Sequence, residues 1–163
     1  MKHTAIIQQK IFSLSSLQKE VNRWRFLQKK IAFTNGCFDI LHEGHIFSLS
    51  AAAKEADILI VGLNSDASTG RLKGDSRPIN NQHSRALLLA SLIMIDAVVI
   101  FDEDTPQNLI TTLMPDVLVK GGDYTVEQVV GAKEVIANGG RVVINNIVDG
   151  VSTTGLIAKI QQL

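Results

Sequence analysis

Residues 34–45 have the sequence TNGCFDILHEGH, and this stretch decides how the chain is expected to fold. A β-branched, apolar run at residues 30–34 leads into it, and an apolar helical pattern at residues 46–56 follows it. The stretch therefore lies where a strand ends and a helix begins. Open α/β sheets bind their ligands at this carboxyl end of the strands.

Four more strand-like runs follow, at residues 58–63, 97–101, 117–120 and 141–144, with helical patterns between them. The first three are apolar at consecutive positions, which is typical of strands covered on both faces. Strands that alternate with helices favour a parallel sheet with right-handed crossovers. The sequence predicts one α/β domain over residues 1–163, with a doubly wound five-stranded parallel sheet. Residues 1–29 are expected to form a basic helical extension packed on it.

The composition is that of a globular chain, since 45% of the 163 residues are hydrophobic and 20% are charged. Sixteen basic residues balance sixteen acidic ones, so no global basic excess favours a nucleic-acid partner. Residues 1–30 do hold seven Lys or Arg against Glu20 alone. A solvated helix face explains this cluster better than RNA binding, because only Trp24 is available among the helical basic residues for base stacking.

Several classes of protein are excluded by simple counts. The longest apolar stretch, residues 86–95, is too short to span a membrane, which takes roughly 20 residues. The N-terminus has no signal-peptide pattern. A single cysteine, Cys37, excludes an internal disulfide and a cysteine-based zinc cluster. We expect a cytoplasmic protein with neither membrane nor nucleic acid as a partner.

The two histidines of the opening stretch, His42 and His45, share one face once the helix has begun. Gly44 leaves room between them for a ligand to approach the backbone. Helix starts offer N–H groups and positive dipole to anions, so we expect a site for phosphate oxygens. A zinc pair is an alternative, but the H-E-x-x-H spacing and a third ligand are missing. Two purely structural histidines are another alternative.

Residues 36–45 match the pattern G-x-F-D-x-x-H-x-G-H and so resemble the cytidylyltransferase-like nucleotidyltransferases. The resemblance continues through residues 61–69, 71–78, 103–107, 119–124 and 149–154. Together these segments look like the D-glycero-β-D-manno-heptose 1-phosphate adenylyltransferases, which make ADP-heptose for lipopolysaccharide cores. The resemblance implies a Rossmann-like fold. Because the sugar-kinase part that many bacteria fuse to this activity is absent, it also implies the stand-alone form.

The resemblance also implies roles for individual residues. The catalytic residues are expected to be His42, His45, Lys73 and Arg85, and the sugar phosphate is expected to contact Lys73, Arg77 and Lys120. The expected nucleotide-binding residues are Asn35, Gly36, Phe38, Asp39, His42, Gly44, His45, Gly122, Asp123, Ser152, Thr153 and Thr154.

Simpler interpretations of these positions stay open from the residues alone. Lys73 and Arg77 also fit an exposed basic loop, and Arg85 fits a surface position on a helix. The two glycines after Lys120 fit an ordinary turn. Residues 152–154 fit plain capping of the last helix, which is compatible with phosphate binding.

Two residues inside the opening stretch need separate interpretation. Cys37 is predicted to pack rather than to act as a nucleophile, since it lies between a strand end and Phe38. Asp39 fits three roles equally well: capping the loop, contacting ribose or amine groups, or helping to position Mg²⁺.

The implied reaction transfers AMP from ATP to a sugar 1-phosphate and releases pyrophosphate. A phosphate monoester has a second pKa of about 6, so the attacking oxygen is anionic near neutral pH and needs no general base. Mg²⁺ bound to phosphate oxygens is expected, and the family implies a homodimer. The runner-up is a cytidylyltransferase for glycerol 3-phosphate, which Ile147 and Val148 weaken by replacing its usual Arg-Thr. A pantetheine-phosphate adenylyltransferase and a non-catalytic nucleotide-binding module are further alternatives.

Overall fold

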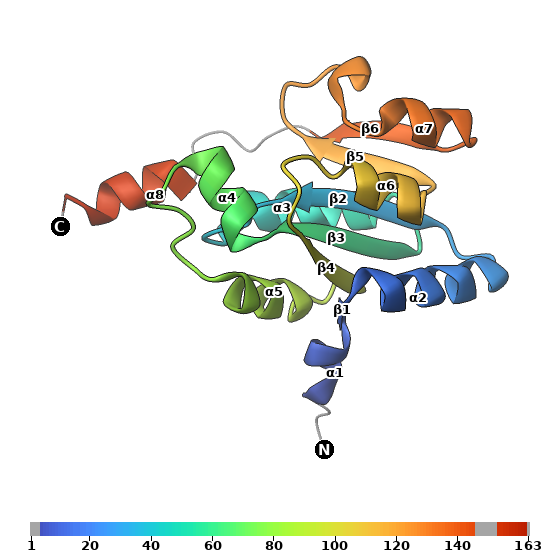
Figure 1. The fold of residues 1–163 in the computed structure, drawn as a ribbon, viewed down its shortest axis with the longest axis horizontal. Coiled ribbons are helices and arrows are strands. Elements are labelled where there is room, and N and C mark those ends of the chain that lie inside the picture. Colours follow the sequence, from blue (N-terminus) through green and yellow to red (C-terminus); the bar gives the residue numbers. More distant parts are fainter. Residues whose placement is uncertain (1–3, 146–152, 163) are drawn as a thin grey trace.

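A six-stranded parallel sheet forms the centre of the computed structural model, which describes residues 4–145 and 153–162. The strands lie in the order β1-β4-β3-β2-β5-β6 across the sheet (Figure 1). Their bounds are β1 (Ile11–Phe12), β2 (Ile31–Gly36), β3 (Ile58–Asn64), β4 (Ala97–Phe101), β5 (Val117–Gly121) and β6 (Arg141–Asn145). The predicted parallel α/β architecture is confirmed, and β2 to β6 correspond to the five predicted strands.

The predicted number of strands was too low by one. β1 has two residues, and they pair with Val98 and Val99 of β4. It lies between α1 (Ala5–Gln9) and α2 (Leu14–Phe26), inside the segment that was expected to be only helical. A two-residue strand is too short to produce the alternation or apolar run by which strands are found in a sequence.

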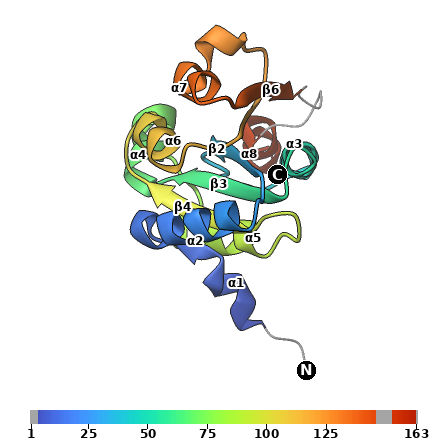
Figure 2. The same cartoon turned by 90° about the vertical axis from the view of Figure 1, so that its right-hand side faces the viewer.

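Helices cover both faces of the sheet (Figure 2). On one face α2, α6 (Gln107–Leu113) and α7 (Ala132–Ala137) bury apolar side chains such as Leu17, Leu113 and Val135. On the other face α3 (Glu43–Ala53) and α5 (Gln82–Ala90) bury Leu49 and Leu89, among others. The consecutive apolar residues of β3 and β4 are needed because each strand contributes side chains to both cores.

At the amino end of the sheet, three aspartates stand immediately before β3, β4 and β5. Asp96 accepts a hydrogen bond from the backbone N–H of Leu59 (2.8 Å), and Asp116 accepts one from Ile31 (3.0 Å). Asp57 accepts one from Lys30 (2.9 Å). Each carboxylate thus satisfies the first N–H groups of the neighbouring strand, which would otherwise lack a partner at the sheet end.

The basic residues of the N-terminal segment are largely used within the fold. Lys29 and Lys30 form ion pairs with Asp57 (3.4 Å) and Asp116 (2.7 Å). Arg25 donates to the carbonyl oxygen of Leu113 (2.7 Å) at the end of α6. Among the described residues, none of the helices has the length and apolar character of a bilayer-spanning segment.

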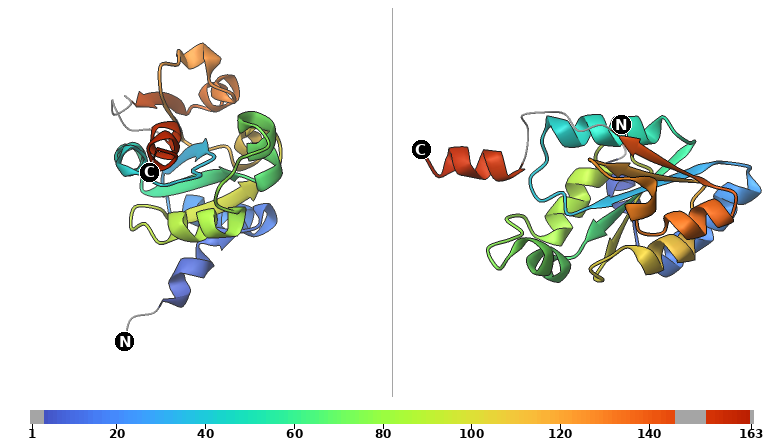
Figure 3. Two further views of the ribbon diagram at one scale, coloured as in Figure 1. Left: turned by 90° about the vertical axis from the view of Figure 1, so that its left-hand side faces the viewer. Right: turned by 90° about the horizontal axis from the view of Figure 1, so that it is seen from above.

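The carboxyl end of the sheet is surrounded by α4 (Asp66–Lys73), the short η1 (Val126–Gln128) and α8 (Thr153–Ile160). Figure 3 shows α8 extending away from the sheet toward the C-terminal end. The sequence had suggested that Lys73 lies in a loop, but the structure makes it the last residue of α4. α4 begins at the N-cap Ser65, whose hydroxyl accepts from the N–H of Ser68 (3.0 Å).

Candidate active site

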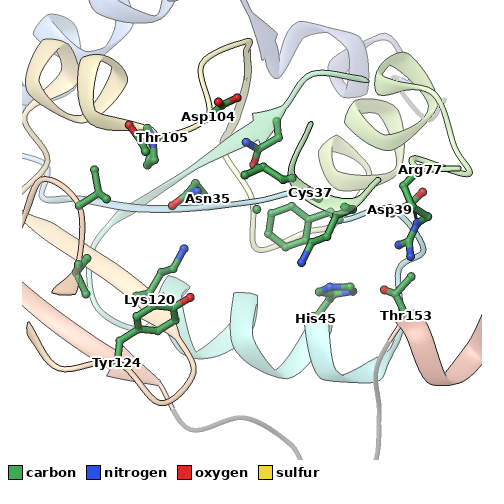
Figure 4. Close-up of a pocket in the computed structure, with 18 of the residues that line it drawn as sticks. Asn35, Cys37, Asp39, His45, Arg77, Asp104, Thr105, Lys120, Tyr124 and Thr153 are labelled. Atoms are coloured by element: carbon green, nitrogen blue, oxygen red, sulfur yellow. Dashed lines mark hydrogen bonds and ion pairs between the residues drawn. The ribbon is translucent and has the colours of Figure 1, made fainter. Parts of the chain in front are cut away.

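A cavity of about 630 Å³ opens at the carboxyl ends of the central strands (Figure 4). Its walls combine the opening stretch of the sequence, the segments that follow β3, β4 and β5, and the start of α8. The lining residues are Asn35, Gly36, Cys37, Phe38, Asp39, His42, His45, Asn64, Leu72, Lys73, Arg77, Asp104, Thr105, Pro106, Leu118, Lys120, Tyr124, Gln128, Val129, Val130, Thr153 and Thr154.

The two histidines stack on each other at the start of α3. His42 is the N-cap and His45 lies in the first turn, with 3.9 Å between ring centroids and 26° between ring planes. The Phe38 ring lies against His45 with centroids 5.2 Å apart. Gly36 allows this packing, because a Cβ atom there would lie 3.0 Å from the Phe38 ring. The glycine and the phenylalanine thus fix the orientation of His45.

The His45 ring is neutral at pH 7. Burial, and in second place the charge of His42, lower its pKa from 6.5 to about 4. The backbone N–H of His42 donates to Nδ1 of His45 (3.4 Å), which assigns the ring proton to Nε2. Nε2 is then a hydrogen-bond donor for a phosphate oxygen. Nδ1 of His42 is buried and has no hydrogen bond of normal geometry within the described ranges, although the His42 side chain lies over the backbone N–H of His45 as in a capping box.

Asp39 fastens two loops together, which is the first of the three roles that the sequence left open. Its side chain is 2% exposed. The carboxylate accepts from Nε of Arg77 (2.5 Å) and from the backbone N–H groups of Ile79 (2.7 Å) and Asn80 (3.0 Å). The loop that carries Arg77 is therefore tied directly to the histidine loop.

Arg85 was expected to contact phosphates, but it is buried and is not among the lining residues given for the cavity. Its guanidinium donates to the carbonyl oxygens of Cys37 (2.6 Å), Asn64 (2.8 Å) and Asn80 (2.9 Å), and to the Asp66 carboxylate (2.7 Å). The side chain is fully buried. The hydrogen-bond partners of Arg85 belong to loops that are distant in sequence. The local helical pattern could not reveal them, and it therefore suggested a surface or ligand-facing position.

Three cationic side chains line the cavity: Lys73, Arg77 and Lys120. Arg77 is paired with Asp39, whereas Lys73 and Lys120 have no ion-pair partner in the part of the chain that the structure describes. Burial lowers the pKa of Lys120; the neighbouring Cys37 acts in the opposite direction, and the nearby charge of Lys73 lowers the pKa as well. Its ammonium group lies 5.5 Å from the centroid of the Tyr124 ring. Two neighbouring, unneutralised cations favour a phosphorylated ligand.

The start of α8 reaches the histidine loop. Thr153 donates its hydroxyl to the carbonyl oxygen of Ile40 (3.4 Å), and both Thr153 and Thr154 line the cavity. Ser152, which was also predicted to bind the nucleotide, lies outside the described residues.

Three predicted nucleotide-binding residues, Gly44, Gly122 and Asp123, are not among the lining residues given for this cavity. Gly122 instead makes a turn, with a φ of +124° that favours glycine and an N–H that donates to the carbonyl oxygen of Asn145 (3.1 Å). Here the structure matches the simpler interpretation of a strand-to-helix turn.

Several lining residues were not singled out from the sequence, among them Asn64, Asp104, Thr105, Tyr124 and Gln128. All follow or end a strand at the carboxyl edge, which is the signal that would have found them. No group of three His, Cys, Asp or Glu side chains suited to a metal ion occurs among residues 4–145 and 153–162. The Mg²⁺ expected with ATP therefore stays a prediction.

A model of the cytidylyltransferase-like family matches residues 33–159. The bifunctional protein HldE of Mesorhizobium japonicum is 54% identical over 151 residues, which cover 93% of this chain and 30% of that protein. The bifunctional protein HldE of Shigella flexneri is 58% identical over 134 residues, which cover 82% of this chain and 28% of that protein. The chain thus spans about 30% of the length of these relatives.

Solved structures show the same fold. A lipopolysaccharide core biosynthesis protein from Thermoplasma volcanium has a TM-score of 0.59 at 27% identity, with 74% of this chain and 97% of that chain covered. A pantoate-beta-alanine ligase from Francisella tularensis also has a TM-score of 0.59, at 14% identity, covering 94% of this chain and 78% of that one. The second likeness concerns the fold alone.

Proposed function

Since the chain belongs to the cytidylyltransferase-like family and is a nucleotidyltransferase, we propose that it transfers AMP from ATP to D-glycero-β-D-manno-heptose 1-phosphate. The products are ADP-heptose and pyrophosphate, and the pathway is lipopolysaccharide core biosynthesis. The stacked pair His42 and His45, in a cavity that also holds Lys73 and Lys120, is the observation that carries this proposal. The identity to the HldE proteins over most of the chain supports the choice of a heptose phosphate.

The chemistry is an in-line displacement at the α-phosphorus of ATP. The anomeric phosphate supplies an oxygen that is already anionic, because its second pKa is about 6. The protein therefore needs to position the reactants and to stabilise charge, without removing a proton. His45 donates Nε2–H to a phosphate oxygen, and His42 contacts the same phosphate chain through its ring.

The other cavity residues bind either the sugar phosphate or the departing pyrophosphate. Lys73 and Lys120 hold the sugar phosphate, with Arg77 beside them on a loop that Asp39 fixes. The start of α8, with Thr153 and Thr154, binds the departing pyrophosphate through hydroxyl and N–H donors. Arg85 acts through the loops it joins and touches neither reactant.

Mg²⁺ enters this scheme with ATP. The ion commonly keeps several waters and binds through substrate phosphates with one or two carboxylates. Asp39 is engaged by three protein donors, so it offers little to a metal. When bound, Mg²⁺ supplies charge neutralisation to the phosphate oxygens. We further propose a homodimer in the cytoplasm, as the family resemblance implied.

A panel of nucleotides and sugar phosphates, followed by pyrophosphate release, tests the proposed function. ATP with heptose 1-phosphate should give the highest kcat/KM. CTP with glycerol 3-phosphate as the better pair would replace the proposal by the cytidylyltransferase reaction, and binding without turnover would indicate a non-catalytic module.

Lys73→Ala should raise the KM for the sugar phosphate by about 5- to 150-fold, as expected for a lost charged contact.

The transfer should be direct, with no nucleotidyl-enzyme. A single displacement inverts the configuration at the α-phosphorus, so ATP made chiral there by sulfur substitution should yield inverted product. Exchange between ATP and pyrophosphate should need the sugar phosphate or product. Retention, or exchange with enzyme and ATP alone, would instead indicate a protein nucleophile such as His42, His45 or Cys37.

A further inference from the structure

Asp104 is a cavity residue to which the proposed mechanism gives no task. It follows β4 and lines the cavity together with Thr105. Figure 4 shows Asp104 and Thr105 on the opposite side of the cavity from His45 and Thr153. A carboxylate therefore lies across the cavity from His45 and Thr153, two of the residues assigned to the reacting phosphates.

Helix α4 holds the Asp104 loop in place. Nε of Arg71 donates to Oδ1 of Asp104 (2.7 Å), and the same guanidinium donates to the carbonyl oxygen of Asp102. One turn earlier, the Ser68 hydroxyl donates to the carbonyl oxygen of Glu103 (3.0 Å). The loop is thus bonded to α4 at three successive residues, and the carboxylate is oriented before any ligand binds.

The ion pair itself contributes little to folding. The Arg71 and Asp104 side chains are 46% and 57% exposed, and exposed pairs of this kind contribute about 0–1 kcal/mol. The ion pair instead orients the Asp104 carboxylate. Oδ1 is engaged by Arg71, whereas Oδ2 has no hydrogen bond from any of the residues that the structure describes. Oδ2 therefore remains an acceptor for a donor in the cavity.

The charges of the cavity favour one orientation of a sugar phosphate. A carboxylate repels phosphate and accepts hydrogen bonds from hydroxyl groups. Lys73 and Lys120 attract phosphate. A sugar 1-phosphate is anionic at one end and rich in hydroxyl groups at the other, and the Asp104 carboxylate and the neighbouring Thr105 hydroxyl suit the second end. Figure 4 shows Lys120 and Asp104 on different sides of the cavity, so the anionic end of the ligand is favoured toward Lys120 and the hydroxyl-rich end toward Asp104.

We propose that Asp104, held by Arg71, binds hydroxyl groups at the end of the sugar remote from the anomeric phosphate and so selects the heptose. This inference rests on the proposed function, since it assumes a sugar 1-phosphate as the acceptor. Mannose 1-phosphate differs from the heptose substrate by one CH(OH) unit at that remote end. Asp104 is accordingly a specificity-determining residue that sets the preference between the two sugars.

The test measures steady-state kinetics of the full chain with ATP and either sugar phosphate. Asp104→Asn keeps the shape and removes the charge, and it should raise the KM for heptose 1-phosphate about 10- to 100-fold, the range for a lost charged hydrogen bond. The KM for ATP should stay within about threefold. The preference for heptose over mannose 1-phosphate should shrink. Arg71→Gln should give a smaller rise in the same KM, because the carboxylate remains but loses its support.

Asp75→Asn is the matched control, since Asp75 is an exposed carboxylate just after α4 and is not among the cavity-lining residues. It should leave both KM values unchanged. If the wild-type protein turns over heptose 1-phosphate but Asp104→Asn keeps its sugar KM, or raises the KM for ATP equally, only the Asp104 assignment is overturned. If the wild type fails to use heptose 1-phosphate at all, the proposed function falls and the assignment falls with it.

Discussion

The two ends of the sheet use charged and polar side chains in opposite ways. At the amino end, Asp57, Asp96 and Asp116 each satisfy a backbone N–H of a neighbouring strand, and two of them also pair with lysines. At the carboxyl end, Lys73 and Lys120 stand in a cavity without ion-pair partners among the described residues. The charges at the amino end complete the fold, whereas these two lysines remain available to a ligand.

Arg85 is the residue that complicates this contrast. It belongs to the carboxyl end but is paired as completely as the aspartates at the amino end. We expect Arg85→Met to lower the free energy of unfolding by about 3–5 kcal/mol, because it leaves a carboxylate and three carbonyl oxygens without their partner. Urea unfolding measures this effect.

The control for Arg85 is Arg141→Met, which breaks an exposed ion pair with Glu55 and should cost less than about 1 kcal/mol. If Arg85→Met were as stable as the wild type but had lost affinity for pyrophosphate, Arg85 would be a phosphate ligand after all. The original sequence-based role would then be restored.

His45 should affect the reaction far more than it affects stability at neutral pH. We expect His45→Ala to lower kcat by roughly 10²-fold or more, the loss typical of one donor to developing charge. The thermal unfolding transition should remain cooperative. Single-turnover rates measure the chemical step, and His83→Ala, at an exposed position on α5, is the matched control. A rate within a few fold of the wild type would remove His45 from the mechanism.

Asp116 should show the converse behaviour at the amino end. Asp116→Asn weakens the bonds to the Ile31 N–H and the Lys30 ammonium, and should cost about 1.5–3 kcal/mol of stability. Both kcat and the two KM values should equal those of the wild type at temperatures where the variant is folded. Changed kinetic constants in the folded variant would show that the two ends of the sheet are coupled.

Local patterns predicted the elements better than they predicted the contacts. β2 to β6 were found because each is an apolar or β-branched run, and the histidine pair was found because helical spacing places both rings together. α4 was missed because its sequence is polar and contains Gly70. β1 was missed because it has only two residues.

Local patterns could not predict the roles of Asp39 and Arg85 either, because the partners of these residues are distant in sequence. Asp39 bonds to residues 38 to 41 positions away, and Arg85 reaches the Cys37 carbonyl oxygen 48 positions away. Sequence spacing gives neighbours within one helix or strand, whereas these partners meet only when four segments of the chain converge at the sheet. The same holds for Asp104, whose place in the cavity depends on its bond to α4.

The pH dependence of stability should separate the two ends of the sheet. Burial and the charge of His42 lower the pKa of His45 from 6.5 to about 4, so between these values the unfolded chain binds more protons than the folded one. The contribution of His45 to stability is therefore fully present above pH 6.5 and is lost as the pH falls toward 4. At the amino end, the hydrogen bond from Lys30 and the pairing with Lys29 lower the pKa of Asp57 below 3.8, so the contribution of Asp57 to stability is lost only in more acidic solution.

Urea midpoints between pH 7.5 and 4.5 should decline less in His45→Ala than in the wild type, since the variant lacks this group. Saturating pyrophosphate should flatten the wild-type decline as well, because an anion beside the ring favours its protonated form. Parallel curves for the two proteins would contradict the assignment of a buried, neutral His45.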